Sequence, residues 1–380
     1  MERLIPFQQE HHMFREALGK FLDKEIVPYY EQWEKEHIIP HEVFEKFGAQ
    51  GYLCMWLDEK YGGSGADFLY QIVETEELYA RGLNALFTKL HGNIIAPYIY
   101  HAGTEEQKMK WLPKAASGEV ILAVAMTEPG AGSDLAAMKS RAVLEGDNWV
   151  LNGSKTFISN GINADLFVVA AKTDTKAGAK GISLFLVEKG TPGFERGNSI
   201  MKIGLHAQDT VELFFDDCRI PKDCLLGQEG KGFIYLMEHL EQERLVAALG
   251  ALAKAERSLK LTVDYVKERQ MFGTTLSKFQ NTQFELAKMQ TEIDVAKSFV
   301  DHIVLELLAG RKVLREVSEA KYFCSELGFR VADRCLQLFG GYGYCEEYPI
   351  ARMFVDSRID RIYAGASEIM LTIVARQMGL

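Results

Sequence analysis

The sequence predicts an α+β protein that is mainly α, with a helical N-terminal domain, a central β-barrel-like domain and a C-terminal four-helix bundle. Three observations support this fold class: helical spacing of apolar residues up to about residue 120, β-type runs between roughly 121 and 225, and long helical stripes after them. We expect domain boundaries at 1–120, 121–228 and 229–380. A chain of 380 residues that is 47% hydrophobic is long enough to give each domain a core.

The N-terminal region begins with apolar residues three and four positions apart, which predicts an amphipathic helix. The helix is expected to end near Pro28. The residues of its stripe are Met13, Phe14, Leu18, Phe21 and Leu22.

The central region contains three runs rich in β-branched and aromatic residues, at 166–171, 182–187 and 211–215. Gly and Asp turn signals separate them, so each run predicts a strand. Residues 141–152 also have β-type composition and end in Asn152-Gly153, a dipeptide typical of hairpin turns. We therefore expect a hairpin turn at Asn152-Gly153.

The C-terminal region has two long stripes at helical spacing, one ending before Gly310 and the other at Gly340-Gly341. Helices of this length usually pack as a bundle. The stripes consist of Met289, Ile293, Ala296, Val300, Ile303 and Leu307, and of Ala320, Phe323, Cys324, Leu327, Val331 and Cys335. The six cysteines form no C-x-x-C pair and have no histidine at zinc-ligand spacing, so we expect no metal site. Cys324 and Cys335 lie on an apolar stripe and are expected to be reduced core thiols.

Charge and hydropathy exclude several classes of partner. The net charge is −10 and no run is rich in Lys or Arg, which argues against nucleic acid and against an anionic membrane surface. No apolar stretch is long enough for a membrane span. The first six residues resemble neither a signal peptide nor a transit peptide, so the expected location is the cytoplasm.

A loop at residues 125–134, AMTEPGAGSD, is the strongest candidate for a binding site, together with TFISNG at 156–161. Its glycines, proline and hydroxyl groups suit a loop that presents backbone N–H groups to an anionic or heteroaromatic ligand. Gly130 and Gly132 also begin a G-x-G dinucleotide fingerprint, but position 135 is Leu and no helix is predicted to follow. An ordinary turn and a cofactor site both remain open from the loop alone.

Glu243 and Arg244 continue the helical face of Phe233, Leu236 and Leu240. A carboxylate on an apolar face loses hydration, which raises its pKa towards the range of a general base. Small residues one turn further on leave space beside it for a ligand. The alternative is that Glu243 lies at the edge of the stripe and is paired with a neighbouring cation.

Six segments in order make the chain resemble the acyl-CoA dehydrogenases over nearly its whole length. These flavoenzymes have a helical, a β and a four-helix-bundle domain and are usually homotetramers. The segments are residues 126–134, 156–161, 268–273, 279–280, 337–343 and 363–369. Residues 204–215 and 242–245 are most similar to the long-chain type.

The resemblance implies FAD as the cofactor, held in two places. Its isoalloxazine would contact the β domain, where Ser159 would form a hydrogen bond with flavin N5. Ser133 would lie near both the pyrophosphate and the acyl-CoA. Its adenosine-diphosphate half would lie across a subunit interface. The implied FAD contacts are Met126, Thr127, Ser133, Phe157, Ile158, Ser159, Arg269, Phe272, Gln280, Gln337, Gly340, Gly341 and Glu368.

The closing segment departs from the commonest family pattern, because it has Ala364 where many members have the catalytic glutamate. In the long-chain and isovaleryl types the base comes from the helix that carries Glu-Arg-Leu, here residues 243–245, so Glu243 is the implied base. Ala366 lacks a hydroxyl that usually contacts FAD, which removes that contact. The implied substrate contacts are Ser133, Arg244, Ala364 and Gly365.

The implied activity is FAD-dependent α,β-dehydrogenation of an acyl-CoA thioester to a trans-2-enoyl-CoA, as in fatty acid β-oxidation. The acyl group would be medium or long, or branched, and electrons would pass to an electron-transferring flavoprotein. Two alternatives are kept: a flavin- or acyl-CoA-binding protein without dehydrogenase activity, and an acyl-CoA oxidase or flavin monooxygenase on the same scaffold.

Overall fold

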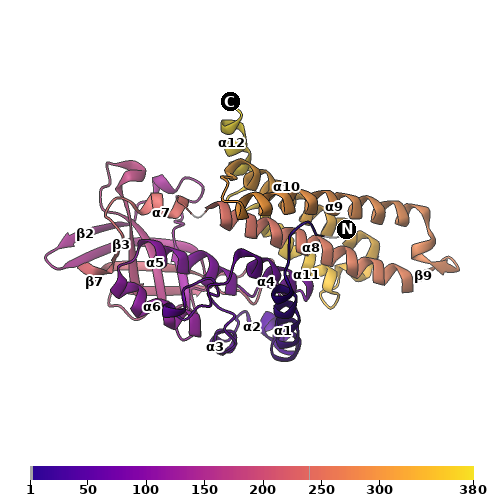
Figure 1. Cartoon of the computed structure of the whole chain (residues 1–380), viewed down its shortest axis with the longest axis horizontal. Helices are drawn as coiled ribbons and strands as arrows, with labels where there is room; N and C mark the ends of the chain where they lie inside the picture. The colour runs from indigo at the N-terminus through magenta and orange to yellow at the C-terminus, as the bar shows by residue number, and fades with distance from the viewer. Residues whose placement is uncertain (1–2, 239) are drawn as a thin grey trace.

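The computed structural model describes residues 3–238 and 240–380 and is mainly helical. Figure 1 shows a β-sheet and a bundle of long helices towards opposite ends of the longest axis, with the N-terminal helices along one side. The N-terminal elements are α1 (Gln9–Glu25), α2 (Val27–Glu36), α3 (His41–Ala49), α4 (Phe68–Ala80), the π-helical η2 (Leu90–Ile95), α5 (Ala96–Ala102) and α6 (Glu105–Ser117). Leu18 and Leu22 of the predicted first stripe are fully buried, whereas Met13 is exposed.

The central sheet has its strands in the order β6-β7-β3-β2-β4-β5-β8, and β1 pairs in parallel with β4. In the described residues β6 and β8 are its edges, so the sheet is not closed into a barrel. The three predicted runs lie in β4, β5 and β7. The strands are β1 (Leu122–Ala125), β2 (Arg141–Glu145), β3 (Asn148–Ser159), β4 (Leu166–Lys172), β5 (Ile182–Glu188), β6 (Phe194–Ser199), β7 (Thr210–Pro221) and β8 (Leu225–Leu226).

The predicted hairpin turn at Asn152-Gly153 is wrong, because both residues lie inside β3. The turn falls instead between Glu145 and Asn148, where Gly146 has a φ of 62°. Gly153 serves a close approach: a Cβ built there would lie 2.3 Å from Ser140 Oγ, and the pairing of β3 with β7 shifts at this point. The glycine therefore marks a β-bulge.

Three long helices, α8, α9 and α10, pack on one another in the C-terminal region, and the shorter α11 packs on α8 and α10. The two predicted stripes form the core of this bundle, except that Phe323 is exposed and Leu307 is only partly buried. All six cysteines are free thiols, and Cys324 and Cys335 are buried as predicted. The elements are α7 (Gly232–Glu238), α8 (Leu240–Glu268), β9 (Gln270–Met271), β10 (Thr274–Thr275), α9 (Gln280–Leu308), α10 (Leu314–Phe339), η7 (Gly340–Tyr344), α11 (Pro349–Ser357), η8 (Arg358–Arg361) and α12 (Ser367–Gln377).

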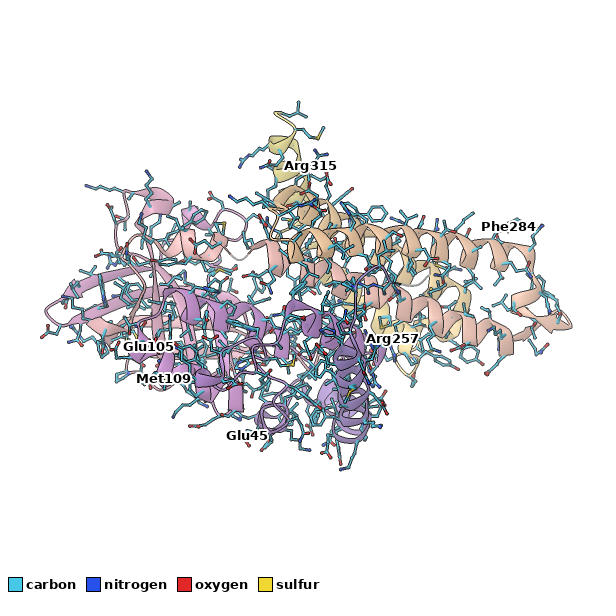
Figure 2. All side chains as sticks on the ribbon, in the orientation of Figure 1. Glu45, Glu105, Met109, Arg257, Phe284 and Arg315 are labelled. Atoms are coloured by element: carbon cyan, nitrogen blue, oxygen red, sulfur yellow. The ribbon has the colours of Figure 1, made fainter. Side chains whose placement is uncertain are left out.

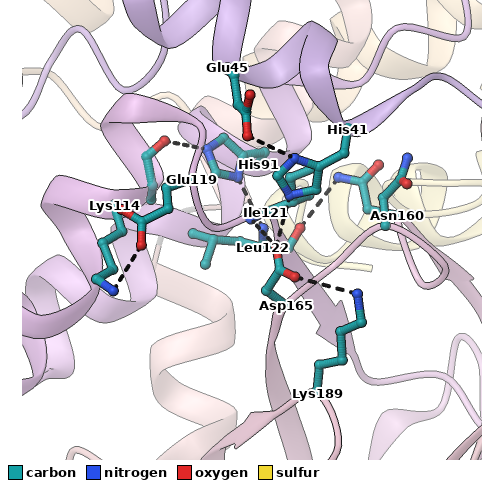
Figure 3. Close-up of polar contacts among 12 residues, drawn as sticks. His41, Glu45, His91, Lys114, Glu119, Ile121, Leu122, Asn160, Asp165 and Lys189 are labelled. Atoms are coloured by element: carbon teal, nitrogen blue, oxygen red, sulfur yellow. Dashed lines mark hydrogen bonds and ion pairs between the residues drawn. The ribbon is translucent and has the colours of Figure 1, made fainter.

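A polar cluster joins the N-terminal helices to the sheet, as Figure 3 shows. Asp165 accepts a hydrogen bond from Ile121 N (3.0 Å) and pairs with His41 Nε2 (3.1 Å). His91 Nδ1 accepts from Leu122 N (3.1 Å), while its Nε2 lies 2.9 Å from Ala115 O. These bonds fix the start of β1, which leads into the candidate binding loop.

Arg257 joins the bundle to the N-terminal helices, where α8 passes α4 (Figure 2). Its guanidinium donates to Ala80 O at the end of α4. None of the described helices has the length and hydrophobicity that a membrane span requires.

Candidate functional site

The two candidate binding segments lie side by side in the structure. Thr156 N donates to Thr127 O (2.9 Å), and Lys155 Nζ donates to Met126 O (3.1 Å). Lys155 also forms a buried ion pair with Glu128 at 2.8 Å. Met126 and Thr127 are thereby brought next to the strand that carries Phe157, Ile158 and Ser159.

Phe157 presents an aromatic ring to the surface from a backbone that is unusual for this residue type. Its side chain is 65% exposed and its φ is 58°, whereas Ile158 beside it is buried. A non-glycine residue in this region costs about 1–3 kcal/mol, and such residues concentrate at binding and active sites. An exposed ring next to Thr127 and Ser159 fits a flat heteroaromatic ligand.

Asn160 fixes the end of this segment. It is buried, has a φ of 60°, and donates from Nδ2 to Leu122 O (3.3 Å). Its Oδ1 accepts from Gln208 Nε2 (3.0 Å). Short polar side chains tolerate this backbone because they form local hydrogen bonds.

The loop at Gly130–Gly132 opens onto free space. A Cβ built at Gly130 or Gly132 meets no atom within 4 Å, and Ser133 is exposed. Only a three-residue 3₁₀ turn, Leu135–Ala137, follows before β2. The strand-glycine-helix order of a dinucleotide fingerprint is therefore missing.

Glu243 is a buried carboxylate in the first turn of α8, only 9% exposed. Tyr98 Oη donates to its Oε1 at 2.9 Å. Burial raises the pKa of Glu243 to about 7, although the Tyr98 hydrogen bond and the charge of Arg244 both lower it. Among the described residues no ion pair of Glu243 is found, although the charge of Arg244 beside it acts on its pKa.

Arg244 is also buried, and burial lowers the pKa of its guanidinium. Within residues 3–238 and 240–380 its Nε has no hydrogen-bond partner. One turn beyond Glu243, Ala247 is partly exposed between the buried Val246 and Ala248. This helix face is therefore partly accessible at Ala247.

Ala364 lies in an exposed turn between η8 and α12, with a φ of 51°. The next residue, Gly365, accepts a hydrogen bond at its carbonyl from Lys321 Nζ. Burial lowers the pKa of Lys321 to about 8. The Ala364 turn is thus tied to α10. Glu368 follows, exposed in the first turn of α12.

A second group of predicted residues gathers at the far end of the bundle. A pocket of about 560 Å³ is lined by Arg269, Gln337, Gly340 and Gly341, among others. Arg269 lies over the Tyr342 ring at 5.2 Å, and a Cβ at Gly340 or Gly341 would meet no atom within 4 Å.

Two further predicted residues of this group do not line the pocket. Phe272 is 90% exposed next to it on the β9–β10 hairpin, at a φ of 49°, and Gln280 begins α9.

Glu243 and the Arg269 pocket lie at opposite ends of α8. Glu243 is in its first turn and Arg269 follows its last residue. At 1.5 Å per residue the 29 residues of this helix span about 43 Å. The first turn of α8 and the Arg269 pocket therefore lie far apart within one chain.

Sequence reasoning missed Tyr98, which is the hydrogen-bond partner of Glu243. The two residues are 145 positions apart, and nothing near Tyr98 in the sequence indicates a site. The buried Lys155–Glu128 pair was missed as well, although Glu128 lies within the candidate loop. In the described part of the chain no group of three His, Cys, Asp or Glu residues is placed to hold a metal ion.

Three family descriptions match the chain in order. They are "Acyl-CoA dehydrogenase, N-terminal domain" at 8–119, "Acyl-CoA dehydrogenase, middle domain" at 123–218 and "Acyl-CoA dehydrogenase, C-terminal domain" at 230–379. Matches to these three domains, which together cover most of the chain, indicate an oxidoreductase that acts on CH–CH groups. The chain belongs to the acyl-CoA dehydrogenase family.

Individual relatives match over nearly the whole chain. The long-chain specific acyl-CoA dehydrogenase of Rattus norvegicus mitochondria is 46% identical, over 98% of this chain and 87% of the relative. The crystal structure of an acyl-CoA dehydrogenase from Geobacillus kaustophilus is 54% identical, covers 100% of both chains and superposes with a TM-score of 0.98. A solved structure of the electron transferring flavoprotein of Acidaminococcus fermentans is 39% identical, with a TM-score of 0.92 over 100% of this chain and 99% of that chain.

Proposed function

We propose that this protein is an FAD-dependent dehydrogenase that converts a medium- or long-chain or branched acyl-CoA into its trans-2-enoyl-CoA, with Glu243 as the general base. The observation that carries the proposal is the environment of Glu243. It is a buried carboxylate with a pKa of about 7, bonded to a tyrosine hydroxyl and next to a partly open helix face. This is the protonation behaviour that a base needs near neutral pH.

The residues around the candidate loop fit a flavin. Phe157 offers an exposed apolar ring, Thr127 and Ser159 offer polar groups, and Gly130 and Gly132 leave room for a ligand close to the backbone. When bound, FAD would supply the hydride acceptor for the substrate β-carbon. The adenosine-diphosphate half would be held by Arg269, Gln337, Gly340 and Gly341, whose pocket combines a guanidinium with accessible backbone.

Glu243 removes the α-proton of the thioester. An acyl chain bound along the Ala247 face excludes water from the carboxylate and makes it a stronger base. The Tyr98 hydroxyl holds the carboxylate in one orientation while leaving Oε2 for the proton. Arg244, buried one residue further, is expected to contact the substrate.

Negative charge that develops on the thioester oxygen needs a fixed donor. From the family resemblance, the proposed donors are the backbone N–H of Ala364, which alanine keeps, and a ribityl hydroxyl that bound FAD would supply. Replacing a carboxylate by alanine at 364 therefore costs no oxyanion stabilisation. Gly365, Ser133 and Glu368 complete the proposed contacts to substrate and cofactor.

The similarity to a long-chain specific enzyme supports a medium or long acyl group, and membership of the family supports an electron-transferring flavoprotein as the electron acceptor. A panel of short, medium, long and branched acyl-CoA thioesters, assayed with an artificial acceptor, would establish the acyl group. The cytoplasmic location stays a prediction.

The separation of the two FAD groups by the length of α8 supports an oligomer in which each FAD touches two chains. The exposed Phe272 and Tyr344 near the Arg269 pocket supply apolar surface for such a contact. We propose a homotetramer, as expected from the family.

The test is to replace Glu243 by Gln and to follow flavin absorbance after anaerobic mixing with acyl-CoA. Loss of the base lowers the rate of flavin reduction by about 10²–10⁴-fold. Glu241→Gln is the matched control, because Glu241 is in the same helical turn but partly exposed, and its carboxylate accepts from Val313 N. Reduction of the Glu243→Gln flavin at the parent rate would exclude Glu243.

Two further readouts separate the alternatives. A parent protein whose flavin is never reduced by any thioester of the panel is a binding protein. Stoichiometric peroxide release during turnover in air identifies an oxidase instead of a dehydrogenase.

A further inference from the structure

The turn that carries Ala364 is held from both sides by buried lysines. Lys254 comes from α8 and Lys321 from α10, and they are 0% and 1% exposed. Buried lysines are rare unless they are paired. The ammonium groups of both lysines contact residues that flank Ala364 in the sequence.

On the N-terminal side, Lys254 Nζ lies 2.7 Å from Asp360 Oδ1. Tyr363 Oη donates to the same oxygen, also at 2.7 Å. Lys254 additionally donates to Asp356 O (3.3 Å). Tyr363, which shares a peptide bond with Ala364, is therefore tied through Asp360 to the helix that carries Glu243.

On the C-terminal side, Lys321 Nζ donates to Gly365 O. Gly365 has a φ of 93°, and a Cβ there would lie 2.5 Å from Met370 Cε. The peptide that follows Ala364 is thus fixed by α10 and by close packing against α12.

Stability alone does not account for this arrangement. A buried ion pair loses much of its attraction to desolvation, and apolar residues of similar size are often as stable. The left-handed backbone of Ala364, with a φ of 51°, is also unfavourable for a non-glycine residue and persists only where the surroundings hold it. The turn thus has an unfavourable backbone and is surrounded by buried polar groups that give little net stability. These groups are the two lysines, the Asp360 carboxylate and the Tyr363 phenol.

We propose that Lys254, Asp360 and Tyr363, with Lys321, are positioning residues that aim the Ala364 N–H at the thioester oxygen. The inference rests on the proposed function. These residues act through the backbone of the turn and touch neither reacting carbon. The same helix α8 thereby sets both the base and the oxyanion donor, which keeps the two in register.

The experiment measures the carbonyl stretch of a trans-2-enoyl-CoA, ¹³C-labelled at the thioester carbon and bound to the oxidised holoenzyme, by infrared difference spectroscopy. A hydrogen bond from Ala364 N–H lowers this frequency relative to the ligand in solution. Tyr363→Phe removes one hydroxyl, and the double variant Lys254→Met/Asp360→Leu removes the ion pair without leaving a buried charge.

Both variants are expected to move the frequency back towards the solution value. We expect kcat to fall about 10–100-fold with little change in KM, as for a group displaced by about 1 Å. The matched control is Lys297→Met/Glu256→Leu, which removes another ion pair of α8 (2.7 Å), one made with α9 and not with the residues around Ala364, and leaves both readouts at parent values.

If the carbonyl frequency in Tyr363→Phe and in the double variant equals that of the parent, the positioning role is overturned, even if kcat falls. A parent enzyme that binds the ligand without any shift overturns the oxyanion assignment of the proposed function together with this inference. A parent shift combined with full activity of Glu243→Gln overturns the proposed base but leaves the positioning role standing.

Discussion

At the scale of single residues, the pairing of Glu243 with Tyr98 is the arrangement that most directly affects chemistry. Burial disfavours the carboxylate form, while the phenol hydrogen bond stabilises it. The two effects oppose each other, and burial is the larger. The result is a carboxyl group that titrates near pH 7 and not near its usual value.

We predict that Tyr98→Phe shifts the acidic limb of the kcat/KM profile to higher pH. Glu243 must be ionised to act, so activity falls as the pH drops through a pKa of about 7. Loss of a hydrogen bond to a charged group costs about 1.5–3 kcal/mol, which raises the pKa by about one to two units. Steady-state rates between pH 5 and 10 measure the shift.

Activity of Tyr98→Phe should return to near the parent level once the pH exceeds the new pKa. A limb at the parent position would show that the Tyr98 hydroxyl does not act on the ionised base. Tyr100→Phe is the control, because its hydroxyl bonds to Asp58 near the surface.

At the scale of elements, the candidate loop and β3 are held together by the Lys155–Glu128 pair. Glu128 also accepts from Lys139 N (2.6 Å) and Ser140 N (2.9 Å). One carboxylate thus closes the loop on itself and attaches it to the strand that carries Phe157. The exposed ring depends on this anchoring for its position.

We predict that Lys155→Met destabilises the protein by about 3–5 kcal/mol, because it leaves the buried Glu128 carboxylate without its cation. Denaturant unfolding of flavin-free protein gives the change in free energy. The double variant Lys155→Met/Glu128→Leu should lose less than the single one. Lys139→Met should be neutral, since only its backbone N–H contacts Glu128; equal losses in all three variants would contradict the argument.

Hydrophobic periodicity was sufficient to predict most elements. The stripes of α9 and α10 and the runs of β4, β5 and β7 are set by which residues are buried, and burial leaves a regular pattern in the sequence. The prediction of a turn at Asn152-Gly153 was wrong because the sequence does not distinguish a glycine that allows close packing from a glycine that allows a turn. The predicted burial of Phe323 was wrong because a residue at the edge of an apolar stripe can be either buried or exposed.

The candidate site was only partly predictable for a related reason. Glu243 stands out locally as a charge on an apolar face, and the loop at 125–134 stands out by composition. Tyr98, Lys254 and Asp360 carry no local signal, because their roles arise from contacts between distant segments. The resemblance to a family supplied the rest of the predicted residues, including Arg269 and Gly340.

At the scale of the whole molecule, the two halves of the proposed FAD site lie at opposite ends of the bundle. Figure 1 shows the sheet and the β9 hairpin at the two ends of the longest axis. Cofactor binding and assembly should therefore depend on each other. Each chain would contribute a flavin face to one site and a phosphate-binding pocket to another.

We predict that Arg269→Gln weakens FAD binding about 10–100-fold, as expected for the loss of a charge-assisted hydrogen bond to phosphate. The ratio of flavin to protein absorbance after gel filtration gives the retention. Light scattering on the same samples should give a mass that is a multiple of the 42.8 kDa chain for the parent. Lys267→Gln is the control because Lys267 is an exposed cation only two residues before Arg269 and does not line the pocket. A monomeric parent that retains FAD would contradict the shared site.

The position of α8 between the two groups has a genetic consequence. With the proposed shared site, a chain defective only at Glu243 and a chain defective only at Arg269 would each be inactive as pure assemblies. When the two are co-expressed, some sites pair the intact carboxylate of one chain with the intact guanidinium of the other. Two loss-of-function alleles of this gene would then complement each other, and alleles altered at the same end of the helix would not.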